Sequence, residues 1–494
     1  NIIVSKINGA LKRHIYYRKI VENLVLIGIV TLIISIAYNY ILPFFNDFVK
    51  VSLEPPIWKV ITINIIILFT IITIGLIYPL LAINRFSTVK RSNQNLQNSK
   101  LLKGKNVIVV TQYTLAFVLL ISSIIVDRQL QLMLKKDLGF SSNNIMKVKL
   151  FYEPPFDPKS KDWSKKRRAE ELKKIKEIPR YINDQLASFS SIKNLSQGNS
   201  PINIFSTDWK RKDDNSKYER LNSLIVTPEH LNLFDFKVIE GRFFQKGIDK
   251  QRGHQILINE AAKLHFGITD INKTKILNRY WSSKEGYQII GIVKDFNYEH
   301  LSAKPKPLIM VYFGDSHAEY FIQFYESKIQ EGIKQVEKLF NAVNPKQTFK
   351  YSFLADEISA LYQKEKRLSS IYILFTIIAL LISAIGLFTI ALYDTQKRVK
   401  EIGVRKVNGA TIKEILIMLN RDFMKWVLVA ILIATPIAFY LMDSWLENFA
   451  YKTSLNWWIF ASAGLFTLII ALLTVSWQSY SAATSNPIES LRDE

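Results

Sequence analysis

The sequence predicts an α-helical membrane protein with six spans and one inserted α+β domain. Six apolar runs each approach the roughly 20 residues that a helix needs to cross a bilayer. Between the third and fourth runs, from about residue 127 to residue 366, no apolar run is long enough to span, and short β-rich segments alternate with helical ones. Lysines and arginines gather in the loops on one side of this topology, which the positive-inside rule assigns to the cytoplasm. The inserted domain therefore falls on the opposite side.

The composition supports a membrane protein and excludes several kinds of site. Hydrophobic residues make up 49% of the 494 residues, in blocks too apolar for a disordered chain. The net charge of +23 could suggest nucleic-acid binding, but the basic residues cluster beside the apolar runs, where the positive-inside rule gives a simpler cause. No nucleic-acid partner is expected. The chain has no cysteine, which excludes a disulfide, a thiolate metal site and a cysteine nucleophile.

Basic segments and spans alternate along the chain. A basic stretch at residues 1–21 precedes the first span, and a polar, basic linker at residues 85–105 separates two halves. The helical pattern of the third span continues past Arg128 towards Gly139, and a single helix over residues 356–393 begins polar and becomes apolar, so both should leave the membrane as stalks. The six predicted spans are residues 21–45, 57–83, 107–126, 368–393, 423–442 and 457–477.

The region between the third and fourth spans contains the predicted α+β domain. A charge-dense run at residues 165–176 (KKRRAEELKKIK) predicts a solvated helix rather than a binding patch. Two carboxylates, Glu260 and Asp295, have no candidate base or metal ligands nearby. We expect Glu260 to start a helix and Asp295 to end a strand, where it binds backbone donors. The predicted strands are residues 145–152, 223–227, 287–295, 307–313 and 349–353.

Several kinds of catalytic site lack their motifs in this sequence. No G-x-x-x-x-G-K-[ST] phosphate loop occurs, so ATP hydrolysis is not expected of this chain. The six histidines show no metal-ligand spacing, and no G-x-S-x-G motif suggests a hydrolase. Residues 368–393, 427–442 and 458–477 contain no Asp, Glu, Lys, Arg or His, which argues against a proton-coupled carrier or an ion channel. We expect no catalytic, cofactor or metal site on the chain itself.

Residues 397–416 (KRVKEIGVRKVNGATIKEIL) form a strongly charged segment between two long apolar runs. Apolar and charged residues interleave there, which is typical of short amphipathic helices, with a break at Asn408-Gly409. The same pattern also fits a basic anchor lying on lipid head groups. An internal sequence repeat favours a more specific role for the charged segment. Residues 4–10 (VSKINGA) resemble residues 404–410 (VRKVNGA), and each copy is followed by two apolar spans.

Six short runs carry a resemblance to a known family. Three of them are KEIGVRKVNGA at residues 400–410, NFAY at 448–451 and NPIESLR at 486–492. They resemble FtsX-like permeases, the membrane subunits of mechanotransmitting (type VII) ABC transporters. The other three are EGRFF at residues 240–244, INEA at 258–261 and GIVKDF at 291–296. These resemble the periplasmic core domain of the macrolide-exporter type. The resemblance covers nearly the whole chain and implies a multi-pass protein of the bacterial inner membrane with a periplasmic core domain.

The resemblance also implies partners and site residues. A separate cytoplasmic ATPase dimer is expected to bind ATP and Mg²⁺ and to dock on the charged segment, while this chain binds no cofactor. Contacts with membrane lipids are implied, and a periplasmic or outer-membrane partner is allowed. The ATPase-coupling residues carried over are Lys400, Glu401, Arg405, Lys406, Asn408, Gly409 and Ala410, with Lys6, Asn8 and Gly9 in the first copy. The stalk residues expected to transmit motion are Gln129, Leu132, Tyr362 and Glu365.

The expected domain scheme follows the same resemblance. It comprises the end of a first membrane repeat with a linker (1–106), a span and stalk (107–136), the periplasmic core domain (137–355) and a second membrane domain (356–494). A first span and a first periplasmic domain are expected to precede residue 1, a natural half-size protein being the alternative. The first copy departs from the family pattern, since Ser5 stands where the second copy has Arg405 and no acidic residue corresponds to Glu401.

The expected function is that of a permease subunit that transmits ATPase-driven motion to the periplasmic domain, for export or extraction of a peptide, drug or lipoprotein. The spans offer mainly small residues with Ser and Thr, which suit close helix packing better than a wet channel, so substrate is not expected to pass between them. The alternative is a membrane sensor, a scaffold or a regulator of a cell-wall hydrolase, whose periplasmic domain binds a ligand without transport.

Overall fold

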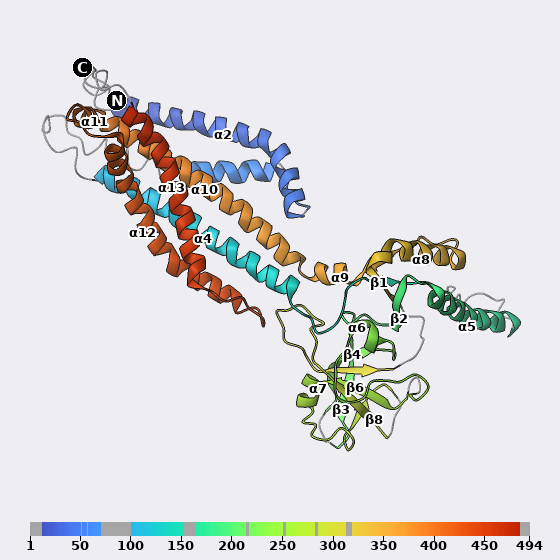
Figure 1. The fold of residues 1–494 in the computed structure, drawn as a ribbon. Helices are drawn as coiled ribbons and strands as arrows, with labels where there is room; N and C mark the ends of the chain where they lie inside the picture. The colour runs from blue at the N-terminus through green and yellow to red at the C-terminus, as the bar shows by residue number, and fades with distance from the viewer. Residues whose placement is uncertain are drawn as a thin grey trace. The chain divides into compact units, whose positions relative to one another are not determined.

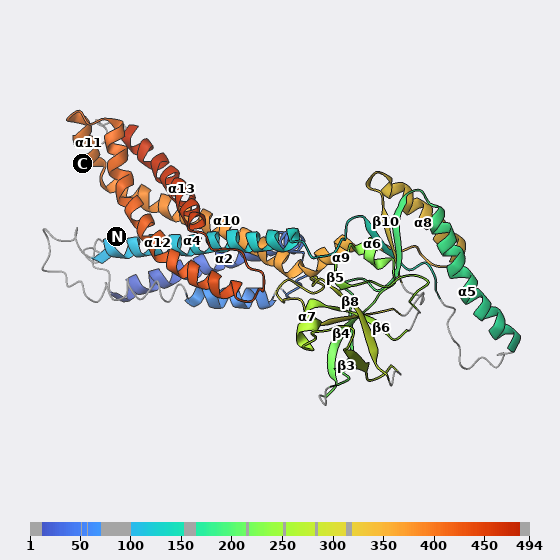
Figure 2. The ribbon, with the colours of Figure 1, turned by 60° about the horizontal axis from the view of Figure 1, so that its bottom comes forward.

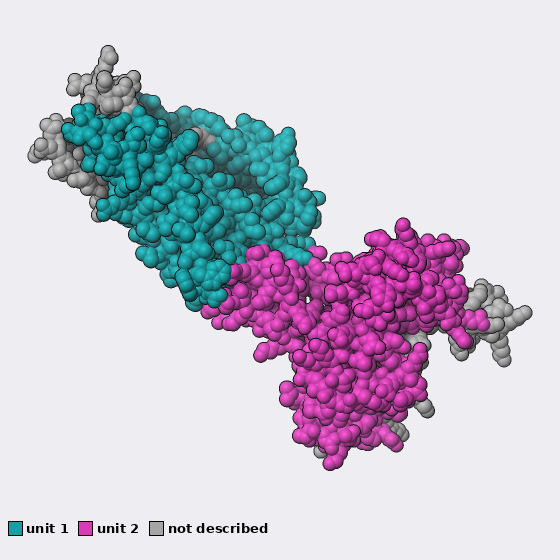
Figure 3. Space-filling model, viewed as in Figure 1, with its two compact units in different colours: residues 1–126, 366–442, 455–494 teal, residues 127–365, 443–454 magenta. Residues whose placement is uncertain are grey.

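The computed structural model describes most of the chain as helices and two sheets. The described residues are 12–50, 52–56, 58–70, 100–152, 165–213, 217–249, 253–281, 285–312 and 319–484. The chain divides into two compact units (Figure 3). Unit 1 consists of residues 1–126, 366–442 and 455–494, and unit 2 consists of residues 127–365 and 443–454.

Five of the described helices are long and apolar enough to cross a membrane (Figure 1). They are α2 (Lys12–Val49), α4 (Lys100–Lys135), α10 (Gln363–Lys397), α12 (Ile412–Leu446) and α13 (Trp457–Thr484). Each contains one predicted span. At the other predicted span, residues 57–83, the described part is the helix Trp58–Thr70, which is shorter than a span, and residues 71–83 lie outside the described part of the chain. The described part of the chain therefore contains five helices long enough to span a membrane, whereas the sequence predicted six.

Helices α4, α10, α12 and α13 pack through small and hydroxyl-bearing side chains. Thr376 on α10 donates a hydrogen bond to the Leu119 carbonyl of α4 at 3.0 Å. Gly386 lies so close to α4 that a Cβ there would be 2.5 Å from Gln112 Oε1. Small residues and hydroxyl groups let membrane helices approach closely in this way. Their shared buried cluster includes Val109, Tyr113, Leu387, Ala391, Phe423, Val427, Ala430, Ala471 and Val475.

The stalk predicted as one helix over residues 356–393 is broken at Tyr362, so that prediction is wrong. Helix α9 (Leu354–Leu361) ends there and α10 begins at the next residue. Tyr362 has φ −99° and ψ 18°, outside the helical region. Its side chain is 1% exposed and its ring lies 5.0 Å from the His300 ring, measured between centroids. Burial of this ring outweighs the helix propensity of the neighbouring residues.

Unit 2 contains a four-stranded antiparallel sheet with two buried faces. Its strand order is β11-β1-β10-β2. Met146 and Ile322 face a core shared with α5 (Lys165–Ser188) and α8 (Ile329–Val343), whereas Ile145 and Phe321 face the other core of the unit. Figure 2 shows α5 and α8 together beside β10. The two-residue period of a strand produces this division. The strands are β1 (Ile145–Val148), β2 (Ile192–Gly198), β10 (Glu319–Phe324) and β11 (Tyr351–Phe353).

A seven-stranded sheet forms the rest of unit 2 and closes on itself. Its order is β5-β8-β6-β9-β4-β3-β7, and β7 pairs back with β8, so six strands make a ring. Trp209, fully buried, lies in the core of this ring with Ile256 and Tyr287. The strands are β3 (Phe205–Arg211), β4 (Glu219–Ile225), β5 (Val238–Gly241), β6 (Gln255–Asn259), β7 (Lys275–Asn278), β8 (Tyr287–Val293) and β9 (Leu308–Val311). Two short helices lie between these strands in the chain, α6 (His230–Phe234) and α7 (Glu260–His265).

The five predicted strands are confirmed as β1, β4, β8, β9 and β11, and the charged run at residues 165–176 is confirmed as part of helix α5. The sequence did not predict β2, β3, β5, β6, β7 or β10. A phenylalanine-rich core joins the two sheets, and it includes Phe234, Phe236, Phe243, Phe296 and Phe321.

Two glycines of the EGRFF and GIVKDF runs lie opposite each other on β5 and β8. Gly241 pairs with Gly291 across these strands. A Cβ at Gly291 would be 2.4 Å from the Arg242 carbonyl oxygen, and one at Gly241 would be 2.3 Å from the Ile290 carbonyl oxygen. Real Cβ atoms do not approach so closely, so only glycine permits this backbone contact. These runs therefore build backbone geometry.

The INEA run joins the end of the neighbouring strand β6 to the start of α7, and the structure there confirms the interpretation of the two carboxylates. Glu260 begins α7, and its Oε2 accepts the N–H of Asp295 at 3.0 Å. Asp295 follows β8, and its Oδ1 accepts the N–H of Ala261 at 3.0 Å. Burial raises the pKa of Asp295, against the lowering effect of the Ala261 hydrogen bond. Both side chains bind backbone donors.

His230 is a fully buried histidine that joins β2 to the loop before α6. Its Nδ1 accepts the backbone N–H of Thr227 at 3.1 Å and lies 2.6 Å from Ser196 Oγ. The ring proton of the neutral form therefore sits on Nε2, which faces the Asn199 carbonyl at 3.3 Å. Burial lowers the pKa of His230 from 6.5 to about 4. The folded state holds this histidine neutral.

Replacing Gly291 by Ala should destabilise unit 2 by roughly 3 kcal/mol, because the new Cβ meets backbone that cannot move aside. Gly247→Ala is the matched control. Gly247 also has a positive φ, +83°, but nothing lies within 4 Å of its Cβ position, so the cost should be only about 1 kcal/mol. Hydrogen exchange of unit 2 in the whole chain measures both unfolding free energies. Equal losses in the two variants would contradict the close approach of β5 and β8.

The depressed pKa of His230 predicts that acid destabilises unit 2. Between pH 6.5 and about 4, His230 is protonated in the unfolded chain but stays neutral in the folded state. The stabilisation is therefore complete above pH 6.5 and is lost as the pH falls, by roughly 3 kcal/mol. In His230→Gln this part of the pH slope of the unfolding free energy should vanish, while His254→Gln, at an exposed position, should keep it. An unchanged slope in His230→Gln would show that another group is responsible.

Candidate functional site

The basic segment, residues 397–416, folds as a short helix, a turn and the start of a long helix. Helix α11 (Val399–Val407) ends at Asn408, and Gly409 adopts φ +88°, so the predicted break at Asn408-Gly409 is confirmed. The second expected short helix is instead the first turn of α12, which is 35 residues long. The physical reason is that no glycine or proline interrupts the chain between Ile412 and Thr435.

Local hydrogen bonds explain why the turn forms at these residues. The N–H of Ala410 donates to the Arg405 carbonyl at 3.0 Å, across a left-handed glycine, as at many helix C-termini. Thr411 and Glu414 then form a capping box. The N–H of Thr411 donates to Glu414 Oε2 at 2.9 Å, and the N–H of Glu414 donates to Thr411 Oγ1 at 3.3 Å. The turn is therefore well defined by the local sequence.

Helix α11 has a buried apolar side and an exposed one. Ile402 is 3% exposed and packs with Ile415 and Leu419, near the ends of α12 and α13. Val404 and Val407, one turn apart, are 51% and 68% exposed. Val404 and Val407 thus form a small exposed apolar strip on an anchored helix.

Charged side chains surround the exposed valines. Arg405 Nη2 lies 3.0 Å from Glu401 Oε1, in an i,i+4 pair in which both side chains are about half exposed. Such surface pairs contribute little to stability and exchange readily with other partners. Arg398 forms a second ion pair, with Asp422 of α12 at 3.2 Å. The segment is thus charged, anchored and accessible.

The structure brings together seven of the ten residues predicted to couple to an ATPase. Lys400, Glu401, Arg405 and Lys406 lie on α11, and Asn408, Gly409 and Ala410 form the turn after it. The first-copy residues Lys6, Asn8 and Gly9 lie outside the described part of the chain.

Gln129 on α4 holds the turn between α12 and α13. Its side chain is fully buried. Nε2 donates to the Tyr451 carbonyl at 2.8 Å, and Oε1 accepts the N–H of Thr453 at 2.9 Å. Gln129 was predicted only as a stalk residue that transmits motion, without a named partner. Its hydrogen bonds go to backbone more than 300 residues away in the chain, which no local pattern could have indicated.

The turn at residues 443–454 belongs to unit 2 and docks through the NFAY run. Phe449 is 9% exposed and belongs to the phenylalanine-rich core, and its ring lies 4.9 Å from that of Trp445. The N–H of Ala450 donates to the Ser302 carbonyl at 3.0 Å. Leu132 of α4 lies in the same neighbourhood, where the Lys136 ammonium sits 4.0 Å from the Tyr451 ring centroid. The sequence analysis included Phe449 in the NFAY run but did not single out Lys136.

Tyr362 and Glu365 lie together with His300 at the break between α9 and α10. His300 Nδ1 accepts the N–H of Ser302 at 3.1 Å, so its Nε2 carries the proton in the neutral ring and faces Glu365 Oε1 at 3.2 Å. Burial raises the pKa of Tyr362. Among the residues that the structure describes, no group of three or more His, Asp or Glu could hold a metal ion.

Comparison with known families identifies the membrane part of the chain. Residues 373–487 match the family model of the FtsX-like permease C-terminal region. A comparison with curated protein sequences finds no match.

Two solved structures are similar to part of the chain. One is the extracellular domain of the noncanonical ABC-type transporter YknZ from Gram-positive bacteria, at 13% identity and a TM-score of 0.27, covering 35% of this chain and 85% of that one. The other is the periplasmic region of MacB from Actinobacillus actinomycetemcomitans, at 14% identity and a TM-score of 0.30, covering 46% and 96%.

The family match covers the helices that surround the basic segment. It begins within α10, includes α11, the turn and α12, and extends just past α13. The match and the five apolar helices fit the predicted location, a multi-pass protein of the bacterial inner membrane with a periplasmic domain. Residues 373–487 of this multi-pass membrane protein thus match the C-terminal region of FtsX-like permeases, and the described part of the chain contains five helices long and apolar enough to cross a membrane.

Proposed function

We propose that this chain is the transmembrane subunit of an ABC transporter and that it passes ATPase-driven motion to unit 2. The observation that carries the proposal is the extent of α12. Its first turn, at Ile412, belongs to the basic segment, and its last residue, Leu446, belongs to the turn docked in unit 2. At 1.5 Å per residue, such a helix is about 50 Å long. A displacement of its first turn would therefore be felt at the docked turn.

The docked turn gives this motion a point of attachment. The carboxamide of Gln129 satisfies one donor and one acceptor of the turn, and the ring of Phe449 is buried in the core of unit 2. Leaving such a buried polar group unpaired costs roughly 1–3 kcal/mol. We therefore expect the turn, the C-terminal part of α4 and the rest of unit 2 to move together, because separating them would break these buried contacts.

The exposed side of α11 supports an ATPase-docking role. Val404 and Val407 supply apolar contact area, and Glu401 and Arg405 supply charges that can re-pair with a partner. In this proposal ATP and Mg²⁺ bind on the partner ATPase, and this chain contributes the docking surface. The basic anchor on lipid head groups remains the competing role for the segment.

The transported material in this proposal is a peptide, a drug or a lipoprotein that is exported or extracted without passing between the spans. The close packing of α4 against α10 at Gly386 and Thr376 supports this view, because it leaves helix surfaces in contact there. A sensor, a scaffold or a cell-wall-hydrolase regulator without transport is the alternative function, and the experiment below separates it from the first.

Replacing Val407 by Asp should remove a co-purifying ATPase. The whole chain is tagged, extracted in detergent from its native membrane, and its partners are identified by mass spectrometry. An ABC-type ATPase should accompany the unmodified chain. A charge placed in the apolar centre of its contact should lower recovery about tenfold, as expected for loss of one central interface residue.

Ile248→Asp is the matched control, because Ile248 is 65% exposed but lies in unit 2. It should leave the recovery of the ATPase unchanged. Absence of any ABC-type ATPase from the unmodified chain would favour the sensor or scaffold. Full recovery with Val407→Asp would show that the ATPase docks elsewhere.

A further inference from the structure

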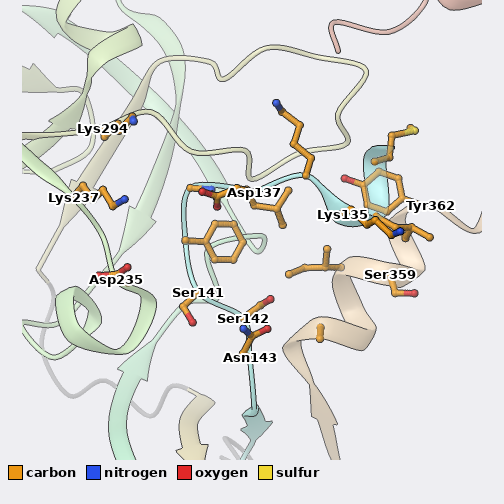
Figure 4. A pocket seen from close by; sticks show the side chains of 18 residues that line it. Lys135, Asp137, Ser141, Ser142, Asn143, Asp235, Lys237, Lys294, Ser359 and Tyr362 are labelled. Carbon is orange, nitrogen blue, oxygen red and sulfur yellow. The ribbon is translucent and has the colours of Figure 1, made fainter. Parts of the chain in front are cut away.

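A polar cleft of about 530 Å³ lies within unit 2, close to the break at Tyr362 (Figure 4). Three parts of the chain line it: the end of α4 with the loop after it, the residues just before β5 and just after β8, and α9 with Tyr362. We call it the lysine cleft, because Lys135, Lys136, Lys237 and Lys294 line it against only two acids, Asp137 and Asp235. The cleft is large enough for a small molecule or for a polar group of a larger one.

The lysines of this cleft are available to a ligand. Within the described part of the chain, Lys135, Lys237 and Lys294 form no ion pair, in contrast to the paired lysines Lys147 and Lys263 elsewhere in unit 2. Lys237 and Lys294 lie side by side because the N–H of Lys294 donates to the Lys237 carbonyl at 2.8 Å. Like charges on paired strands repel each other. An anion between them would relieve this repulsion.

Hydrogen bonds fix the walls of the lysine cleft in place. The N–H of Ser141 donates to the Phe234 carbonyl at 2.7 Å, and the N–H of Asn297 donates to the Leu138 carbonyl at 2.7 Å. Gly139, at φ +84°, approaches Phe296 so closely that a Cβ would be 3.1 Å from Phe296 Cβ. These contacts hold the loop after α4 against the end of α6 and the segment that follows β8. The site therefore exists before a ligand arrives, which lowers the entropic cost of binding.

The remaining polar groups of the cleft are suited to an anion. The hydroxyl groups of Ser141, Ser142 and Ser359 and the amide of Asn143 can donate hydrogen bonds. Ammonium and hydroxyl donors together are the usual ligands of phosphate and carboxylate groups. Asp137 is occupied within its own loop, where its Oδ1 accepts the N–H of Gly139 at 2.9 Å. The lining thus carries an excess of positive charge.

We propose that the lysine cleft is a binding site for an anionic group, a phosphate or carboxylate, carried by a small solute or by a lipid head group. A ligand there would touch the end of α4 and the residues just before the α9–α10 break at once. It would thereby hold these two parts of unit 2 in one arrangement. The binding claim does not depend on an ATPase, so it can fail or hold independently of the proposed function.

Lysine footprinting of the whole chain in nanodiscs tests the site. Acetylation rates are measured by mass spectrometry in three arms: phosphatidylcholine alone, phosphatidylcholine with inorganic phosphate, and phosphatidylcholine mixed with phosphatidylglycerol. Lys135, Lys237 and Lys294 should be selectively protected in an anion arm, and Lys304 and Lys346, which are exposed, should not. Protection by phosphate assigns the site to a free solute. Protection by phosphatidylglycerol alone assigns it to a lipid head group.

The variant Lys237→Gln/Lys294→Gln completes the test, with Lys135 as the remaining reporter. Loss of one charge-assisted hydrogen bond corresponds to roughly a tenfold loss of affinity. The anion concentration needed for half-protection of Lys135 should therefore be at least about tenfold higher in this variant. The control pair Lys304→Gln/Lys346→Gln should leave it unchanged. Equal reactivity of cleft and control lysines in all three arms would overturn the proposal. Protection of Lys135 that is unaffected by the cleft variant would overturn it as well.

Discussion

The buried carboxamide of Gln129 is the interaction on which the arrangement of unit 2 and its attached helices depends. It joins α4 to the turn between α12 and α13 through one donated and one accepted hydrogen bond. Both stretches also contribute apolar side chains to the phenylalanine-rich core, Leu130 and Met133 from α4 and Phe449 from the turn. A buried amide without hydrogen-bond partners costs free energy. This contact therefore keeps together two stretches of chain that lie more than 300 residues apart in the sequence.

A second feature, the break at Tyr362, makes the two stalks different. α4 is uninterrupted from Lys100 to Lys135, whereas the other stalk is divided into α9 and α10. A continuous helix transmits a displacement along its axis, and a broken one bends at its joint. His300 packs on Tyr362 and faces Glu365, so the joint is lined by specific contacts. We infer that α4 and α12 transmit motion and that the α9–α10 joint accommodates it.

The sequence predicted those features that are encoded locally. Hydrophobic runs located five membrane helices, and Asn408-Gly409 located the end of α11, because a left-handed glycine and a capping box need only adjacent residues. Features decided by distant residues were missed. The partner of Gln129 and the break at Tyr362 both depend on tertiary packing. Strands β2 (IKNLSQG) and β3 (FSTDWKR) were missed because polar residues are frequent in them and some, such as Ser196 and Thr207, occupy buried positions.

Pulsed electron paramagnetic resonance most directly tests whether motion reaches unit 2 through Gln129. Spin labels at Lys413→Cys and Ile248→Cys need no removal of native cysteines, since the chain has none. With the partner ATPase bound, the distance between the labels should change on addition of ATP. In Gln129→Ala the change should be lost while ATP hydrolysis continues, and Gln131→Ala, at an exposed neighbouring position, should behave like the unmodified chain. An undiminished distance change in Gln129→Ala would contradict the account.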